Sequence, residues 1–369
     1  MGSTRTESSP RRWIGLDGLR GLAAVAVLVL HASMYSNPGR PPGTATDVVF
    51  RSGHLGVTLF FVLSGFLLFA PWARAASDGT RAPGIAGYAV RRAARVFPAY
   101  WFALAGAALL LAGTGSSHAL RPEHIPILLT AQQDLVVTTP AELIPPAWTL
   151  GIEITFYAAL PLLGLALVRW VRRPRAQLLA CAGLFAGSIA FNVWVHAGGA
   201  DGRWHSTLFG DLYAFAAGMG ATVVAARFAG PRGLVVGFGA ALVLLNALLH
   251  DPIGWTALDS LRDAPAALGF ALLVVGLADS PVLGSAPLRW LGDRSFGLYL
   301  WHYPVIAALA VRGWMPSSLV GLLAIVLPVS LLAGHVSWVL LERPLAARAR
   351  RLRRPVRRRT RWAPAPARA

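Results

Sequence analysis

The sequence contains no lysine, a single cysteine and few charged residues. Only 14% of its 369 residues are charged, whereas 55% are hydrophobic. A soluble domain of this length cannot bury so much apolar surface, so the composition excludes that class and predicts a polytopic helical membrane protein. Because Cys181 has no second cysteine to pair with, an intrachain disulfide is also excluded. All 34 basic residues are arginine, which we attribute to a biased nucleotide composition.

Ten apolar segments follow one another along the chain. Each is close to the roughly 20 residues that an α-helix needs to cross the hydrocarbon core of a bilayer. The predicted spans are residues 13–35, 53–72, 97–115, 147–170, 176–197, 207–226, 231–250, 263–283, 295–312 and 318–342.

The distribution of arginine between the spans sets their orientation. With the N-terminus inside, most of the 34 arginines fall on the cytoplasmic side, as the positive-inside rule requires. Those that fall outside are Arg40, Arg51, Arg121, Arg203, Arg262 and Arg312. The sequence therefore predicts an all-α polytopic membrane protein with about ten transmembrane helices and both termini in the cytoplasm.

The predicted membrane domain covers residues 13–344 and has a tail at each end. Residues 1–12 form a short cytoplasmic tail. Residues 345–369 are rich in arginine, proline and alanine, so we expect them to be disordered and to contact anionic lipid headgroups. We expect no binding of nucleic acid, because no aromatic stacking residues accompany the arginines.

The first span carries two ionisable residues on one face. Arg20 and His31 are eleven residues apart, which on an α-helix is about 20° more than three full turns and about 16 Å of axial rise. An arginine inside a membrane helix costs roughly 2.5–3.5 kcal/mol or more, so such residues are functional candidates. Asp17 lies one turn before Arg20, and we expect the two to pair.

Two other groups of charged residues lie in or beside the membrane. Arg92 and Arg95 share a helix face at the cytoplasmic boundary, a spacing that suits phosphate. Glu153 lies in an otherwise apolar span, flanked by Trp148 and Tyr157. Helix counting places Glu153 about as deep as His31, so the two are candidates for a general base and its orienting partner. A buried ion pair between helices is the alternative for Glu153.

Two polar residues have ordinary structural explanations. Ser64, in FFVLSGFLL, is typical of close helix packing, and no G-x-S-x-G elbow marks it as a nucleophile. His302 lies in LYLWHYPV near the middle of the ninth span, where a lone histidine usually bonds to another helix. The histidines are scattered and predict no metal site.

In their order along the chain, these motifs resemble the membrane acyltransferase-3 family of O-acetylases and nodulation-factor acyltransferases. The resemblance covers roughly residues 14–344. It rests on DGLRG with Arg20 and His31, FFVLSGFLL, the Arg92–Arg95 pair before VFPAYW, WTLGIEITFY around Glu153, and LYLWHYPV around His302. Thr149 and Phe296 stand where the family commonly has Ser and Tyr.

The resemblance implies an acyl-CoA-dependent O-acyltransferase of the bacterial cytoplasmic membrane. It would move an acyl group, usually acetyl, from cytoplasmic acyl-CoA to a hydroxyl of a cell-surface carbohydrate or glycosylated acceptor. We expect no tightly bound cofactor; acyl-CoA is a co-substrate. Arg20, Arg92 and Arg95 would bind it, and Trp148, Tyr157 and His302 would lie near the acceptor.

We predict that neutral His31 is the general base on the acceptor hydroxyl, since histidine has an ordinary pKa of about 6.5. Asp17 would support Arg20, and Glu153 would orient His31 or an acceptor hydroxyl. An acyl-histidine intermediate is the alternative route. Two other functions stay open: acylation of a macrolide or another secondary metabolite at the cytoplasmic face, and a secondary transporter or flippase. The sequence does not indicate the oligomeric state.

Overall fold

The computed structural model describes residues 13–36, 44–116, 120–133, 142–249, 261 and 263–351. These residues form helices and connecting turns, with no strand among them. The α-helices are α1 (Gly15–Ser36), α2 (Ala45–Arg51), α3 (Leu55–Asp78), α4 (Ile85–Leu111), α5 (Ile125–Leu129), α6 (Trp148–Trp170), α7 (Pro174–Trp194), α8 (Leu208–Ala225), α9 (Arg232–Leu249), α11 (Ala264–Leu277), α12 (Ala286–Val311), α13 (Leu319–Ser337) and α14 (Arg343–Arg351). The all-α fold predicted from composition is confirmed.

A helix occupies each of the ten predicted spans. Among the described residues, eight helical segments are long and apolar enough to cross a membrane, and they include α1, α3, α4, α6, α7, α8, α9 and α13. The helix α11 has only 14 residues, and α12 is longer but more polar, because it carries Arg294 and His302. The multi-pass membrane class is confirmed, whereas the count of ten crossings and the cytoplasmic termini stay predictions.

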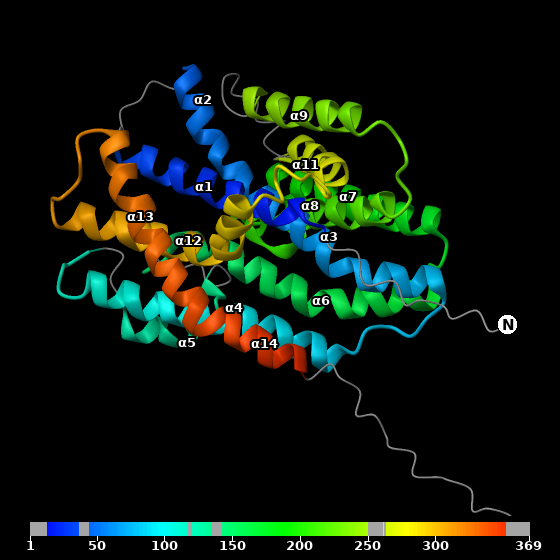
Figure 1. Ribbon diagram of the computed structural model, residues 1–369, viewed down its shortest axis with the longest axis horizontal. Coiled ribbons are helices and arrows are strands. Elements are labelled where there is room, and N and C mark those ends of the chain that lie inside the picture. The colour runs from blue at the N-terminus through cyan, green and yellow to red at the C-terminus, as the bar shows by residue number, and fades with distance from the viewer. Residues whose placement is uncertain are drawn as a thin grey trace, which may run out of the picture.

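The long helices lie roughly side by side, with α9 at one edge and α4 with α5 at the other (Figure 1). The helix α1 contacts α3 and α12, and α13 crosses α12 obliquely (Figure 1). Apolar side chains fill the space between the helices, including a stack of Phe61, Phe215 and Phe156 between α3, α8 and α6. The packing leaves α1 in the interior, in contact with the helices that carry Ser64 and His302.

Small residues let α1 and α12 approach closely. A Cβ atom on Gly292 of α12 would overlap the backbone carbonyl oxygen of Asp17 in α1. Likewise, a Cβ on Gly18 would overlap the carbonyl oxygen of Leu283, just before α12. Close backbone contact at small residues is the usual way in which membrane helices associate. It brings His31 of α1 against the buried face of α12.

The last helix corrects one predicted boundary. Residues 345–351, which we assigned to a disordered tail, belong to α14. The helix follows α13 through the π-helical turn Trp338–Glu342, and its Ala349 is buried. Contacts with α4 support it, and these contacts are not visible in its arginine-rich composition. Residues 1–12 and 352–369, which make up the rest of the two predicted tails, lie outside the described residues.

Candidate active site

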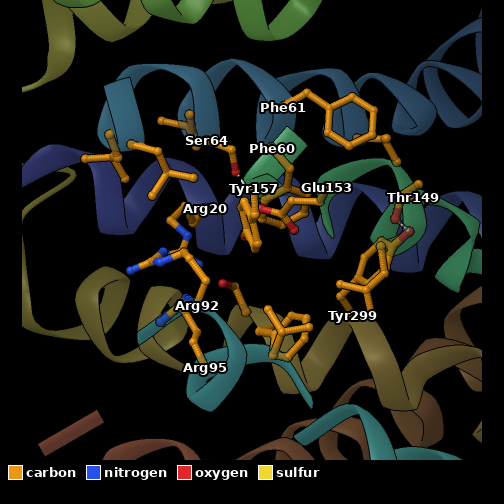
Figure 2. A pocket seen from close by; sticks show the side chains of 18 of the residues that line it. Arg20, Phe60, Phe61, Ser64, Arg92, Arg95, Thr149, Glu153, Tyr157 and Tyr299 are labelled. Carbon is orange, nitrogen blue, oxygen red and sulfur yellow. Dashed lines mark hydrogen bonds between the residues drawn. The ribbon is translucent and has the colours of Figure 1, made fainter. Parts of the chain in front are cut away.

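A cavity of about 90 Å³ lies between α1, α3, α4, α6 and α12. Figure 2 shows its polar side chains in three groups. Arginines lie at one end, Thr149 and Tyr299 lie at the other, and Glu153 and Tyr157 lie between them. The cavity is thus cationic at one end and hydroxyl-bearing at the other.

Three arginines form the cationic end, and we call them the arginine cluster: Arg20 from α1, and Arg92 and Arg95 from α4. Within the part of the chain that the structure describes, none of them makes a hydrogen bond or an ion pair within 4.0 Å. Arg92 lies over the ring of Tyr157, 5.9 Å from its centroid. Guanidinium groups left unpaired around a cavity are suited to bind an anion, above all phosphate.

Glu153 faces the cavity and contacts α3. Its Oε1 accepts a hydrogen bond from the Ser64 hydroxyl at 2.6 Å. The structure shows no contact between Glu153 and His31, although we expected the carboxylate to orient that ring. Helix counting predicted how deep Glu153 lies in the membrane, but not which helix it faces. Because α6 packs against α3, Glu153 faces α3. Ser64, which we interpreted as a packing residue, is instead the hydrogen-bond donor to this carboxylate.

The hydroxyl end of the cavity joins α6 to α12. The Tyr299 hydroxyl donates to the backbone carbonyl of Pro146 at 2.7 Å. It lies 2.8 Å from Thr149 Oγ1, which itself lies 3.2 Å from the same carbonyl oxygen. The ring of Tyr299 also lies 5.7 Å from the ring of His302. Tyr299 therefore lines the cavity and packs beside His302.

His31 of α1 and His302 of α12 form what we call the histidine pair. Nε2 of His302 lies 3.1 Å from Nδ1 of His31, and the ring centroids are 5.0 Å apart. Neither histidine lines the cavity. His302 is fully buried, with 0% of its surface exposed, and its place near an acceptor stays a prediction.

Two further predictions concern residues outside the cavity. Asp17 is half-buried and does not line it. No ion pair within 4.0 Å joins Asp17 to Arg20, because the Arg20 side chain extends into the cavity. Trp148, expected near the acceptor, lines a separate apolar cavity of about 520 Å³ on the opposite face of α6. Of the three residues expected near an acceptor, only Tyr157 faces the cavity.

Glu342 is a buried carboxylate that does not line the cavity. The residue lies in the π-helical turn after α13 and is 5% exposed. Neither oxygen of its carboxylate makes a well-formed hydrogen bond within the described chain. The charges of Arg95 and Arg20 act on it, so Glu342 balances part of the arginine cluster from a distance. In the sequence, Glu342 is recognisable only as a carboxylate in an apolar span. Its position beside α4 depends on how the helices pack together.

Comparison with known proteins decides the family. A family model described as an acyltransferase domain matches residues 13–341. The chain belongs to this acyltransferase family. It is 30% identical to Nodulation protein 10 of Rhizobium leguminosarum bv. viciae, covering 93% of this chain and 96% of that protein. No solved structure matches the chain significantly.

The family also includes longer relatives. The chain is 25% identical to the peptidoglycan O-acetyltransferase OatA of Listeria monocytogenes, over 82% of this chain and 51% of that protein. It is 25% identical to the O-acetyltransferase OatA of Staphylococcus aureus, over 91% of this chain and 58% of that protein. The chain thus spans little more than half the length of these two relatives. The resemblance identified from the motifs is confirmed, and the protein is an acyltransferase with multiple membrane spans.

Proposed function

We propose that this acyltransferase moves an acyl group, most simply acetyl, from acyl-CoA to a hydroxyl of a carbohydrate or glycosylated acceptor. Two relatives are named as O-acetyltransferases, one of them for peptidoglycan, and this supports the acceptor class. The observation that carries the proposal is the arginine cluster, three unpaired guanidiniums at one end of the cavity. Such a cluster suits the phosphates of coenzyme A.

The donor would enter from the cytoplasm, in the bacterial cytoplasmic membrane, because Arg92 and Arg95 lie at the predicted inner boundary. From Arg20, the unbroken helix α1 rises about 16 Å to His31, comparable to an extended phosphopantetheine arm. With the phosphates on the arginine cluster, the thioester would reach toward the histidine pair. An acyl group would then cross the bilayer without the whole cofactor.

The cavity must widen to admit such a donor. Sites that enclose drug-sized ligands have volumes of about 300–1,000 Å³, whereas this cavity holds about 90 Å³. Tyr299 lines the cavity, and its ring lies beside that of His302. We therefore infer that α12 or its Tyr299 side chain moves when the donor binds.

In the transfer step, Nε2 of neutral His31 accepts the proton of the acceptor hydroxyl. The acceptor oxygen forms a bond to the thioester carbonyl carbon, the carbon–sulfur bond breaks, and the proton passes from His31 to the leaving thiolate. The products are the ester and free coenzyme A, and His31 returns to its neutral form. Glu153, which faces the cavity, would hold an acceptor hydroxyl, and Asp17 would act on Arg20 only at a distance.

The test is the release of CoA thiol from acetyl-CoA by the purified protein, alone and with a panel of glycan and macrolide acceptors. The wild type is compared with His31→Ala and Arg20→Gln, and Arg74→Gln serves as control, because Arg74 is exposed on α3 away from the cavity. Acceptor-stimulated release that is lost in His31→Ala supports the proposal and identifies the acceptor class. Absence of release with every acceptor contradicts it.

A further inference from the structure

The hydrogen bonds around the histidine pair determine where its protons lie. Nδ1 of His302 is 2.6 Å from the backbone carbonyl oxygen of Tyr299. A carbonyl oxygen only accepts, so this nitrogen carries a proton. In a neutral imidazole the other nitrogen is then an acceptor, which makes Nε2 of His302 an acceptor in a fully buried place.

The same reasoning applies to His31. Its Nδ1 is 2.9 Å from the carbonyl oxygen of Val27 and 3.1 Å from Nε2 of His302. Both neighbours are acceptors, so Nδ1 of His31 carries the proton and its Nε2 holds a lone pair. No described residue bonds to that Nε2. The two backbone carbonyls thus orient both rings in one direction, and a single basic nitrogen is left open.

We propose that His302 is a positioning residue: by accepting from Nδ1 of His31, it fixes the tautomer and ring orientation in which Nε2 of His31 is the base. Its effect on catalysis rests on the proposed function, whereas its effect on the tautomer does not. The role is that of the orienting group in a catalytic triad, performed here by a neutral ring. A neutral partner suits this position, because a carboxylate buried there without compensating donors would be costly.

His302 is a better acceptor for this purpose than the Val27 carbonyl. In an α-helix, the carbonyl of residue i−4 already accepts the backbone N–H of residue i, so the Val27 carbonyl is shared between the backbone and the side chain of His31. The ring of Tyr303 packs edge-on against His31 at 5.4 Å. The hydroxyl of Tyr303 bonds to that of Tyr35 at 2.8 Å, which limits rotation of the His31 ring.

The test compares two amide variants that differ by one methylene group. The His302→Gln carbonyl can reach Nδ1 of His31, whereas the shorter His302→Asn side chain can bond to the Tyr299 carbonyl but not to His31. Nitrogen-15 NMR of protein labelled at its nine histidines reports which nitrogen of each ring is protonated. The His31 signal is assigned by its absence in His31→Ala. As a control we use His196→Gln, because His196 is exposed in the turn that follows α7.

In the wild type and His302→Gln, we expect His31 to be protonated at Nδ1 alone. In His302→Asn, we expect a mixture of tautomers. An unchanged His31 tautomer in His302→Asn, or protonation at Nε2 in the wild type, would overturn the proposal. These spectra need no substrate, so they test the tautomer of His31 even if no acyl transfer to any tested acceptor is found.

Kinetics supplies the second readout. We expect kcat in His302→Asn to fall roughly tenfold or more, since a misplacement of about 1 Å can cost about 100-fold. The KM for acetyl-CoA should stay unchanged, and His302→Gln should restore most of kcat. A rise in KM with kcat unchanged would instead place His302 in donor binding and contradict a positioning role.

Discussion

The arginine cluster and the histidine pair share α1, with α4 completing the first and α12 the second, but their hydrogen-bonding states are opposite. The three guanidiniums of the arginine cluster face a cavity and have no described hydrogen-bond or ion-pair partner. In the histidine pair, three of the four ring nitrogens are bonded. The arginine cluster therefore has several hydrogen-bond donors available for a ligand, whereas the histidine pair has only one ring nitrogen, Nε2 of His31, without a described partner.

This difference indicates two separate tasks. Charges in a membrane protein are costly, and Glu342 balances only part of the arginine cluster from a distance, so we infer that an anion binds to the cluster for part of the reaction cycle. A ring with a single open nitrogen cannot hold a large ligand, but it can accept one proton in a defined direction. Changes at the arginine cluster should therefore affect KM for the donor, and changes at the histidine pair should affect kcat.

The largest expected effect is that of His31→Ala. Loss of a general base typically costs about 10²–10⁴-fold in rate, so acceptor-dependent CoA release should fall by that factor. Binding of CoA, measured at equilibrium, should stay at the wild-type level. His196→Ala is the matched control at an exposed histidine. Residual transfer above a tenth of the wild-type rate would remove His31 from the chemistry.

A smaller effect is expected for Arg95→Gln. A hydrogen bond to a charged group is worth about 1.5–3 kcal/mol, so KM for acetyl-CoA should rise about 10- to 100-fold. Acetyl-pantetheine, a thioester without the phosphates, should react equally well with the variant and the wild type. If Arg95→Gln impaired both donors equally, the arginine cluster would not be a phosphate site.

The close contact between α1 and α12 at Gly292 should contribute to stability. In Gly292→Ala, the new Cβ would overlap the Asp17 carbonyl oxygen, and such overpacking typically costs about 1–3 kcal/mol. The thermal midpoint should fall and transfer should weaken. Gly187→Ala in α7 is the control, because nothing lies within 4 Å of its added Cβ. Equal midpoints for the two variants would contradict the close contact of α1 with α12.

The smallest effect is expected for Ser64→Ala. The variant removes the 2.6 Å hydrogen bond to Glu153, but the carboxylate faces the cavity, where water can replace the hydroxyl donor. The transfer rate should stay within about threefold of the wild type, since water-mediated bonds are nearly as favourable. A loss as large as that of His31→Ala would instead identify Ser64 as a nucleophile.

The positions of the membrane helices could be predicted because the bilayer constrains each helix through its own sequence. A helix satisfies its own backbone groups, and about 20 apolar residues are needed to cross the hydrocarbon core. Runs of apolar residues therefore marked a helix in each of the ten predicted spans, and α-helical periodicity placed Arg20 and His31 on one face of α1. The arginine spacing in α4 likewise predicted that Arg92 and Arg95 act together, and both line the cavity.

Contacts between distant helices could not be predicted in the same way. Ser64 and Glu153 are 89 residues apart, and His31 and His302 are 271 apart. Helical periodicity and depth give the height and face of a side chain, but its neighbours depend on which helices pack together. For this reason, we paired Glu153 with His31 from their equal depth, whereas His302 of α12 is the actual neighbour of His31.

The most direct test of the separation between donor binding and proton transfer compares two variants in one experiment. Equilibrium binding of CoA and the steady-state kinetics of acetyl transfer are measured for His31→Ala and Arg20→Gln. We predict that His31→Ala binds CoA as the wild type does but does not turn over. Arg20→Gln should bind CoA more weakly and still approach the wild-type kcat at saturating donor. Loss of CoA binding in His31→Ala, together with an unchanged KM in Arg20→Gln, would contradict this division of tasks.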